Sequence, residues 1–192
     1  MAARIGISKS NVVETAFDLL EETQNIQLVS MTAVAARLGI RVQSLYAHID
    51  GTVGLQRELA LRSLKKLAQH LNQAAIGVAG IDAIRAVLKA KFDFALEHPA
   101  AFKASIYPPG NDAQIKEAIE QVNYPMHKIL QDTGVQESMI IHWSRLVLSA
   151  IYGYSALHQN GQLTLPVSTK ESIDYIITVL VTEIDGKTSI VR

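Results

Sequence analysis

Hydroxyl, amide, phenol and imidazole groups are concentrated in one short stretch of this chain, residues 41–48, which reads Arg-Val-Gln-Ser-Leu-Tyr-Ala-His. Amide and hydroxyl groups on a helix can pair with base edges in the major groove, and a phenol or imidazole can bond a phosphate. Taken alone, Tyr46 is more often a half-buried surface aromatic and His48 an ordinary capping or surface histidine. Their joint spacing points to nucleic-acid binding rather than to bond-breaking chemistry.

Two short helices are needed to present these groups. Ser30 is expected to cap the first helix, and Gly39 is expected to end it in a left-handed conformation. Only residues 39–41 separate that helix from the second run, residues 42–48. Two short helices joined by a three-residue turn with a glycine are typical of a helix-turn-helix. The N–H groups at the start of the first helix also form an anion-binding site.

The rest of the chain predicts an all-α fold of about nine helices, because apolar residues recur at three- and four-residue spacing. A helix from 112 onward contains Pro125, which should kink or split it. The other expected helices span 9–24, 30–39, 42–48, 52–75, 81–97, 99–106, 136–159 and 169–184.

Residues 30–49 resemble the DNA-binding region of TetR-type transcriptional regulators, in which a helix ending in glycine precedes a recognition helix with Leu-Tyr-x-His and an apolar residue. About 55 N-terminal residues carry the resemblance. It implies a helix-turn-helix domain at 5–66 and an effector-binding and dimerisation domain at 77–192. It also implies a ligand-responsive repressor that acts as a homodimer on a palindromic double-stranded DNA operator.

The expected DNA-contacting residues follow from this resemblance and from the side-chain chemistry. They are Ser30, Thr32, Arg41, Gln43, Ser44, Tyr46, Ala47, His48 and Thr52. Two positions depart from the family pattern, since Arg41 replaces the usual Ser or Thr cap and Thr52 replaces a phosphate-contacting lysine. We expect Arg41 or Arg57 to compensate for the lost lysine; without compensation, the affinity would be weak or the operator unusual.

The charge of the chain is zero overall, with 18 basic and 18 acidic residues, which excludes a polybasic nucleic-acid carrier. Between Ser30 and Lys66, however, six basic residues face two acidic ones, a net charge of +4. The chain has no cysteine, so disulfides and thiolate sites are excluded. We expect a cytoplasmic protein, because no apolar run resembles a signal peptide or a membrane span.

The helices at 136–159 and 169–184 are apolar nearly all round, which indicates burial on most sides. Either they form the central core of a bundle, or they also meet their copies in a homodimer, and the second interpretation is preferred. A small apolar or aromatic effector is expected in an apolar pocket. Candidate lining residues, each also explicable by core packing, are Phe92, Phe102, Tyr107, Tyr124, His127, Trp143, Tyr152 and His158.

Two other functions remain open. One is a helical dimerising or binding module with weakened DNA binding, which the threonine at position 52 favours. The other is a small all-helical enzyme, against which the sequence offers no phosphate loop, dinucleotide glycine pattern, nucleophile elbow or HExxH motif. The six histidines show no close metal-ligand spacing, so neither a metal, a cofactor nor a catalytic residue is expected.

Overall fold

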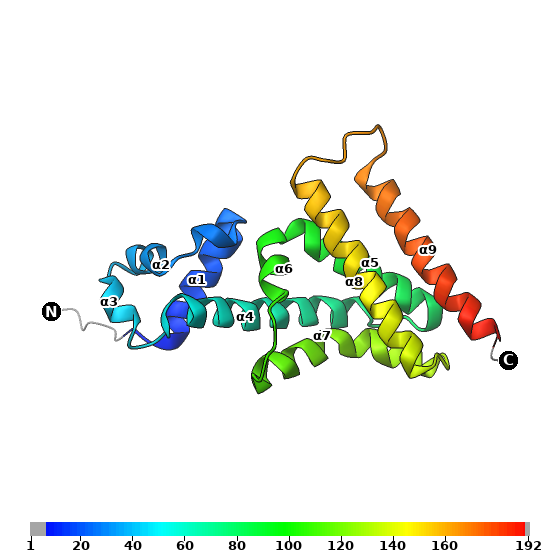
Figure 1. Ribbon diagram of the computed structural model, residues 1–192, viewed down its shortest axis with the longest axis horizontal. Helices are drawn as coiled ribbons and strands as arrows, with labels where there is room; N and C mark the ends of the chain where they lie inside the picture. Colours follow the sequence, from blue (N-terminus) through cyan, green and yellow to red (C-terminus); the bar gives the residue numbers. More distant parts are fainter. Residues whose placement is uncertain (1–6, 191–192) are drawn as a thin grey trace. The chain divides into compact units, whose positions relative to one another are not determined.

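The computed structural model describes residues 7–190, with side chains described through Asp185. This part of the chain forms nine α-helices and one 3₁₀ turn, without a strand, which confirms the predicted all-α fold (Figure 1). The elements are α1 (Lys9–Thr23), η1 (Ile26–Leu28), α2 (Met31–Leu38), α3 (Val42–Leu45), α4 (Gly51–Ala74), α5 (Gly80–Glu97), α6 (Pro99–Ser105), α7 (Ala113–Asp132), α8 (Glu137–Gln159) and α9 (Thr169–Ile190). Within the described residues, no helix is both long enough and apolar enough to span a bilayer.

The helices form two compact units. Unit 1 contains the chain up to Leu64 together with His98–Lys116, and unit 2 contains Lys65–Glu97 together with the chain from Glu117 onward. The segment 98–116 joins unit 1 because α6 packs against α1 and η1. The predicted domains at 5–66 and 77–192 remain predictions, and their ends at 5–6 and 191–192 lie outside the described residues.

In unit 1, α1 begins with a capping box formed by two short polar residues, Ser8 and Asn11. The Ser8 hydroxyl accepts from the Asn11 N–H, and the Asn11 side chain accepts from the Ser8 N–H. The buried face of α1 packs against α2, and this face contains Val12, Ala16, Phe17 and Leu20. An ion pair between Arg37 and Glu22 also joins the two helices. The first helix of the predicted pair is thereby held against the core.

Unit 2 is built around α5, which packs against both α8 and α9. The last two helices run side by side in opposite directions (Figure 1). The indole Nε1 of Trp143 in α8 donates to the backbone oxygen of Leu180 in α9 at 3.0 Å. Pro125 lies within α7 without splitting it, so one of the two outcomes expected for this proline is excluded. Pro125, like Val122 and Leu130 on the same helix, is buried.

Candidate nucleic-acid interface

The two helices of the predicted helix-turn-helix are present, with the expected turn between them. The Ser30 hydroxyl accepts from the Ala33 N–H at 3.1 Å and so caps α2. Gly39 ends the helix with φ +67°, a left-handed conformation in which a side chain would be strained. Its N–H bonds back to the last turn of α2. The caps predicted for this helix are confirmed at both ends.

The second helix, α3, is shorter than the predicted run 42–48, because it ends at Leu45. The bonds at its two ends close three-residue turns: the Ser44 N–H donates to the Arg41 oxygen and the His48 N–H to the Leu45 oxygen. Arg41 occupies the N-cap position and makes no side-chain cap hydrogen bond. Residues 46–48 therefore lie in a turn that leads into α4, which begins at Gly51 with φ +56°.

Side chains in and after α3 divide into an outward and an inward set. Gln43, Ser44 and Ala47 are exposed, and Tyr46 has 61% of its surface exposed. Leu45 and Ile49 are buried at 0% and 3% exposure. The two apolar residues hold the segment against unit 1, so its amide, hydroxyl and phenol groups are free to meet a ligand.

The remaining predicted contact residues also lie in unit 1. Ser30, Thr32, Arg41 and Thr52 are exposed, and His48 is half-buried. Thr32 lies in the first turn of α2 and Thr52 in the first turn of α4. The structure thus leaves each hydroxyl and the Arg41 guanidinium accessible to an anion.

Arg57, by contrast, is engaged within the protein. Its Nη1 donates to Glu58 at 2.8 Å, and its Nη2 donates to Asp112 at 3.1 Å. Its Nε also donates to Asp112, and Nη2 reaches Gln114. We expected either Arg41 or Arg57 to replace the missing lysine. Because the guanidinium of Arg57 is paired within the protein, Arg41 remains as the candidate.

Two further arginines of residues 30–66 also interact with side chains of unit 1, one through an ion pair and one through an aromatic ring. Arg37 pairs with Glu22. The guanidinium carbon of Arg62 lies 5.5 Å from the centre of the Phe17 ring, a cation–π distance. Three of the six basic side chains in residues 30–66 thus interact with groups of unit 1, so fewer of them are available to attract phosphates.

The eight predicted effector residues are divided between the two units and between core and surface. Phe102 and Tyr107 belong to unit 1, and the other six belong to unit 2. Phe92, Phe102 and Trp143 are buried, whereas Tyr124, Tyr152 and His158 are exposed and Tyr107 and His127 are half-buried. The His127 ring bonds Glu137 at 3.0 Å, which holds the pKa of that carboxyl below its ordinary value. The effector site therefore stays a prediction.

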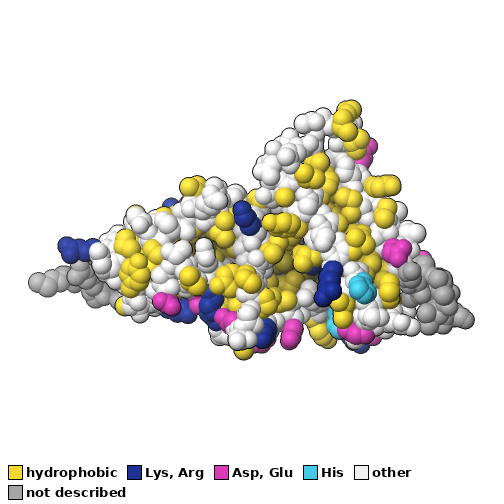
Figure 2. Space-filling view, in the orientation of Figure 1, with side chains coloured by type: hydrophobic (Ala, Val, Ile, Leu, Met, Phe, Trp, Pro, Cys, Tyr) yellow, Lys and Arg dark blue, Asp and Glu magenta, His cyan; other side chains and the backbone are white. Residues whose placement is uncertain are grey.

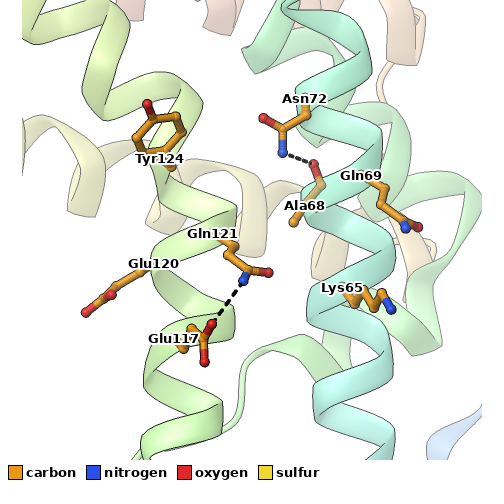
Figure 3. Close-up of a pocket in the computed structure, with 8 residues that line it drawn as sticks. All are labelled: Lys65, Ala68, Gln69, Asn72, Glu117, Glu120, Gln121 and Tyr124. Atoms are coloured by element: carbon orange, nitrogen blue, oxygen red, sulfur yellow. Dashed lines mark hydrogen bonds between the residues drawn. The ribbon is translucent and has the colours of Figure 1, made fainter.

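One groove of unit 2 includes a residue of that set. It lies between α4 and α7 and has a volume of about 500 Å³ (Figure 3). Its lining residues are Lys65, Ala68, Gln69, Asn72, Glu117, Glu120, Gln121 and Tyr124. Most of these side chains are polar and exposed, in contrast with the apolar pocket expected for the effector. Across the described residues, no three His, Asp or Glu side chains converge as metal ligands.

A comparison with protein families identifies the second half of the chain. Residues 84–180 match the family described as "Tetracyclin repressor-like, C-terminal domain", a match over half of the chain. The chain belongs to the TetR family. As a member of it, the chain is a DNA-binding transcriptional regulator. The match lies outside residues 30–49, so the two ends of the chain support the same TetR-family assignment independently.

Individual proteins resemble this chain in sequence or in fold. The chain is 26% identical over 178 residues to the Bacillus subtilis (strain 168) protein named "Uncharacterized HTH-type transcriptional regulator YobS", covering 92% of each. A Rhodococcus sp. RHA1 structure titled as a protein of unknown function has a TM-score of 0.75 at 17% identity, covering 95% of this chain and 98% of that one. The Streptomyces coelicolor regulator SCO7222, titled a TetR, has a TM-score of 0.69 at 18% identity, covering 97% and 100%.

One residue of the TetR-like half was missed by our sequence interpretation. Lys91 falls within the apolar pattern of α5, and burial lowers its pKa from 10.5 to about 8. The sequence contained a signal for Lys91, because a charged residue stands there at a position where the helical pattern calls for an apolar one.

Proposed function

We propose that this TetR-family regulator binds a palindromic operator as a homodimer and represses transcription from it. The observation that carries the proposal is the arrangement around α3, where Leu45 and Ile49 are buried while Gln43 and Tyr46 point their polar groups outward. A recognition helix needs this combination, since it must be fixed to its domain and still reach base edges. Twofold protein symmetry then implies half-sites one helical turn apart, about 34 Å.

The roles within the interface follow from the side-chain chemistry. The Gln43 amide can pair bidentately with adenine in the major groove, which would give sequence selectivity. The Tyr46 hydroxyl, the Arg41 guanidinium and the N-terminus of α2 would contact phosphates and set the position of the head on the duplex. Because several basic side chains are already paired, specificity would depend more on base contacts than on bulk attraction.

The proposed dimer interface is an exposed apolar surface on α8 and α9. On α8, Ile141, Leu148 and Tyr152 share one stripe at spacings of seven and four residues, and each is 41–47% exposed. On α9, Tyr175 and Val179 are 72% and 50% exposed. Figure 2 shows hydrophobic side chains over these helices on the face in view. Residues at such spacings face the same side of a helix, so a second copy could cover both stripes.

Ligand response completes the proposal. A small effector bound in unit 2 would favour dimers in which the spacing of the two helix-turn-helix domains does not match the operator. This requires the effector to bind that state and the DNA-binding state with unequal affinity. Because a regulator must reach the chromosome, we place this activity in the cytoplasm.

The test is binding of fluorescent duplexes from the region upstream of the regulator's own gene, followed by anisotropy at two salt concentrations. The parent should bind one duplex with salt-dependent affinity. Tyr46→Phe, which lacks only the hydroxyl, and Tyr46→Ala, which also lacks the ring, should both bind more weakly. Tyr124→Phe removes the hydroxyl of a tyrosine in unit 2 that is 63% exposed, and this variant should bind DNA like the parent.

Two outcomes would count against the proposal. Equal affinity of Tyr46→Ala and the parent would remove α3 from the interface. Dimers without salt-dependent affinity for any duplex would favour the alternative, a binding module that has lost tight DNA binding.

A further inference from the structure

The longest run of the sequence without a charged residue covers the second half of α8 and the loop that joins α8 to α9. Residues 146–169 contain no Lys, Arg, Asp or Glu, although 19% of the whole chain is charged. Protein surfaces that stay in water normally carry charges of both signs. Where such a charge-free run also exposes apolar side chains, it indicates a surface that another molecule covers.

The α8–α9 loop, residues 160–168, exposes the apolar side chains of this run. Leu165 is 81% exposed, the highest value among the large hydrophobic residues that the structure describes. Val167 and Leu163 are 61% and 44% exposed. The loop extends beyond the ends of α8 and α9 (Figure 1), and hydrophobic side chains lie at its tip (Figure 2). The described part of unit 2 thus leaves the tip of the loop uncovered.

Hydrogen bonds fix both ends of the α8–α9 loop. At the end of α8, Gly161 takes φ +65° and the Gln162 N–H donates to the Leu157 oxygen at 2.9 Å. At the start of α9, the Ser168 hydroxyl accepts from the Glu171 N–H at 3.1 Å, and the Glu171 carboxylate accepts from the Ser168 N–H at 3.0 Å. A loop anchored at both ends loses less conformational entropy when its tip docks, which favours binding.

The partner that this surface fits is a second copy of unit 2. Leu148 and Tyr152 of the proposed dimer interface belong to the same charge-free run, so the loop continues that interface without an intervening charge. The exposed stripes on α8 and α9 supply five residues, whereas a stable interface takes about 20–30 residues a side. A nucleic acid or a charged peptide would need opposite charges, which this run lacks.

We infer that the α8–α9 loop packs against unit 2 of a second copy of this chain, with Leu165 buried in the contact. The inference rests on the proposed homodimer and adds to its interface a segment outside the two helices. Because a twofold dimer repeats every contact, each subunit docks its loop on the other and receives a loop in return. The apolar tip is thereby removed from water in the assembled regulator.

Thiol protection tests this contact directly, because the chain has no cysteine of its own. Leu165→Cys and Ile76→Cys each introduce a single thiol into the full chain. Ile76 is the matched control, since it is an apolar residue of unit 2, 68% exposed, in the turn after α4. In the dimer, iodoacetamide should alkylate the Leu165→Cys thiol about tenfold or more slowly than the Ile76→Cys thiol, although position 165 is the more exposed within one subunit. In concentrated urea the two thiols should react alike.

The dimer dissociation constant measures what the contact contributes. Leu165→Ser should raise it about tenfold or more, because a twofold dimer buries the leucine side chain twice. Ile76→Ser should leave it unchanged. Sedimentation over a range of concentrations gives both constants, and circular dichroism checks that the variants fold, as expected for substitutions at exposed positions. A Leu165→Ser dimer that dissociates like the parent, or equal alkylation rates for the two thiols in the dimer, would overturn the inference.

These measurements also separate the loop contact from the homodimer. If the parent is a dimer and the Leu165→Cys thiol stays fully reactive in it, the homodimer stands and the loop contact fails. If the parent is a monomer at every concentration, the homodimer and the loop contact both fail. Protection of the same thiol by phosphatidylglycerol vesicles, without protection in the dimer, would assign the loop to a lipid surface and also overturn the inference.

Discussion

Arg57 of α4 and Asp112, just before α7, form a two-point ion pair in which the Arg57 Nε and Nη2 groups donate to the two carboxylate oxygens of Asp112. The two residues are 55 positions apart in sequence, and both belong to unit 1. Each side chain is 26% exposed, so the pair is partly shielded from solvent. The Asp112 carboxylate also accepts from the backbone N–H groups of Gln114 and Ile115, which caps α7. One carboxylate thus holds both the start of α7 and the first half of α4.

Replacing Asp112 should destabilise the protein. Asp112→Ala loses both the cap and the ion pair, whereas Asp112→Asn keeps a capping oxygen and loses the charge. We expect a lower melting temperature for both, with alanine lower than asparagine. Glu22→Gln breaks the Arg37 pair, whose side chains are both 51% exposed, and should change little. Equal melting temperatures for Asp112→Ala and the parent would rule out this role.

The same carboxylate predicts an acid dependence. The hydrogen bond from Arg57 is the main reason that the pKa of Asp112 lies below its ordinary value of 3.8. A lowered folded-state pKa means that Asp112 contributes stability above pH 3.8, and that this contribution is lost as the pH falls from there through the folded-state pKa. The difference in melting temperature between the parent and Asp112→Asn should therefore shrink below pH 3.8, and a constant difference would contradict the assignment.

Two substitutions within residues 41–48 should separate base recognition from phosphate contact. Gln43→Ala should weaken operator binding by about 1–3 kcal/mol and leave binding to a scrambled duplex unchanged. Arg41→Gln should weaken binding to both duplexes and lower the slope of log K against log salt by about one. Anisotropy titrations over a salt series measure both quantities. The roles would be wrong if the two variants behaved alike.

The apolar stripe on α8 makes a prediction about assembly. Leu148→Glu places a charge in the proposed dimer interface and should shift the protein towards a monomer in analytical ultracentrifugation. Leu146→Glu is its matched control, because Leu146 is 51% exposed on the same helix and lies away from the stripe of Ile141, Leu148 and Tyr152. It should remain a dimer. A dimer that survives Leu148→Glu with the affinity of the parent would exclude this interface.

Lys91 should make stability depend on pH in the alkaline range. Its folded-state pKa of about 8 lies below the ordinary 10.5, so the unfolded state binds more protons between these values. Stability should accordingly rise with pH across that window. Lys91→Met should be more stable than the parent at pH 7, by roughly 3 kcal/mol at most. Urea unfolding of both proteins from pH 7 to 10.5 tests this, because the gap must close as the pH rises.

Local sequence signals were sufficient to predict most of the helices and the position of the polar residues within 41–48. Ser8, Ser30 and Gly39 act on neighbours within a few residues, so their caps follow from the chain itself. The extent of α3 was not predictable in this way. Residues 46–48, predicted as its last turn, instead form a turn that leads to the buried Ile49 and on to α4, so tertiary packing decides where the helix ends.

The sequence by itself determined that the chain is all-α and that a helix-turn-helix lies near its N-terminus, with the polar side chains of Gln43, Ser44 and Tyr46 in and just after its second helix, because these depend on short-range spacing. Only the tertiary structure decided which charges are free. Arg57 meets Asp112 across 55 residues, and Lys91 meets no carboxylate at all within the described residues. Counting charges along the chain cannot show this, since the energy of a charge depends on the partners and solvent that folding places beside it.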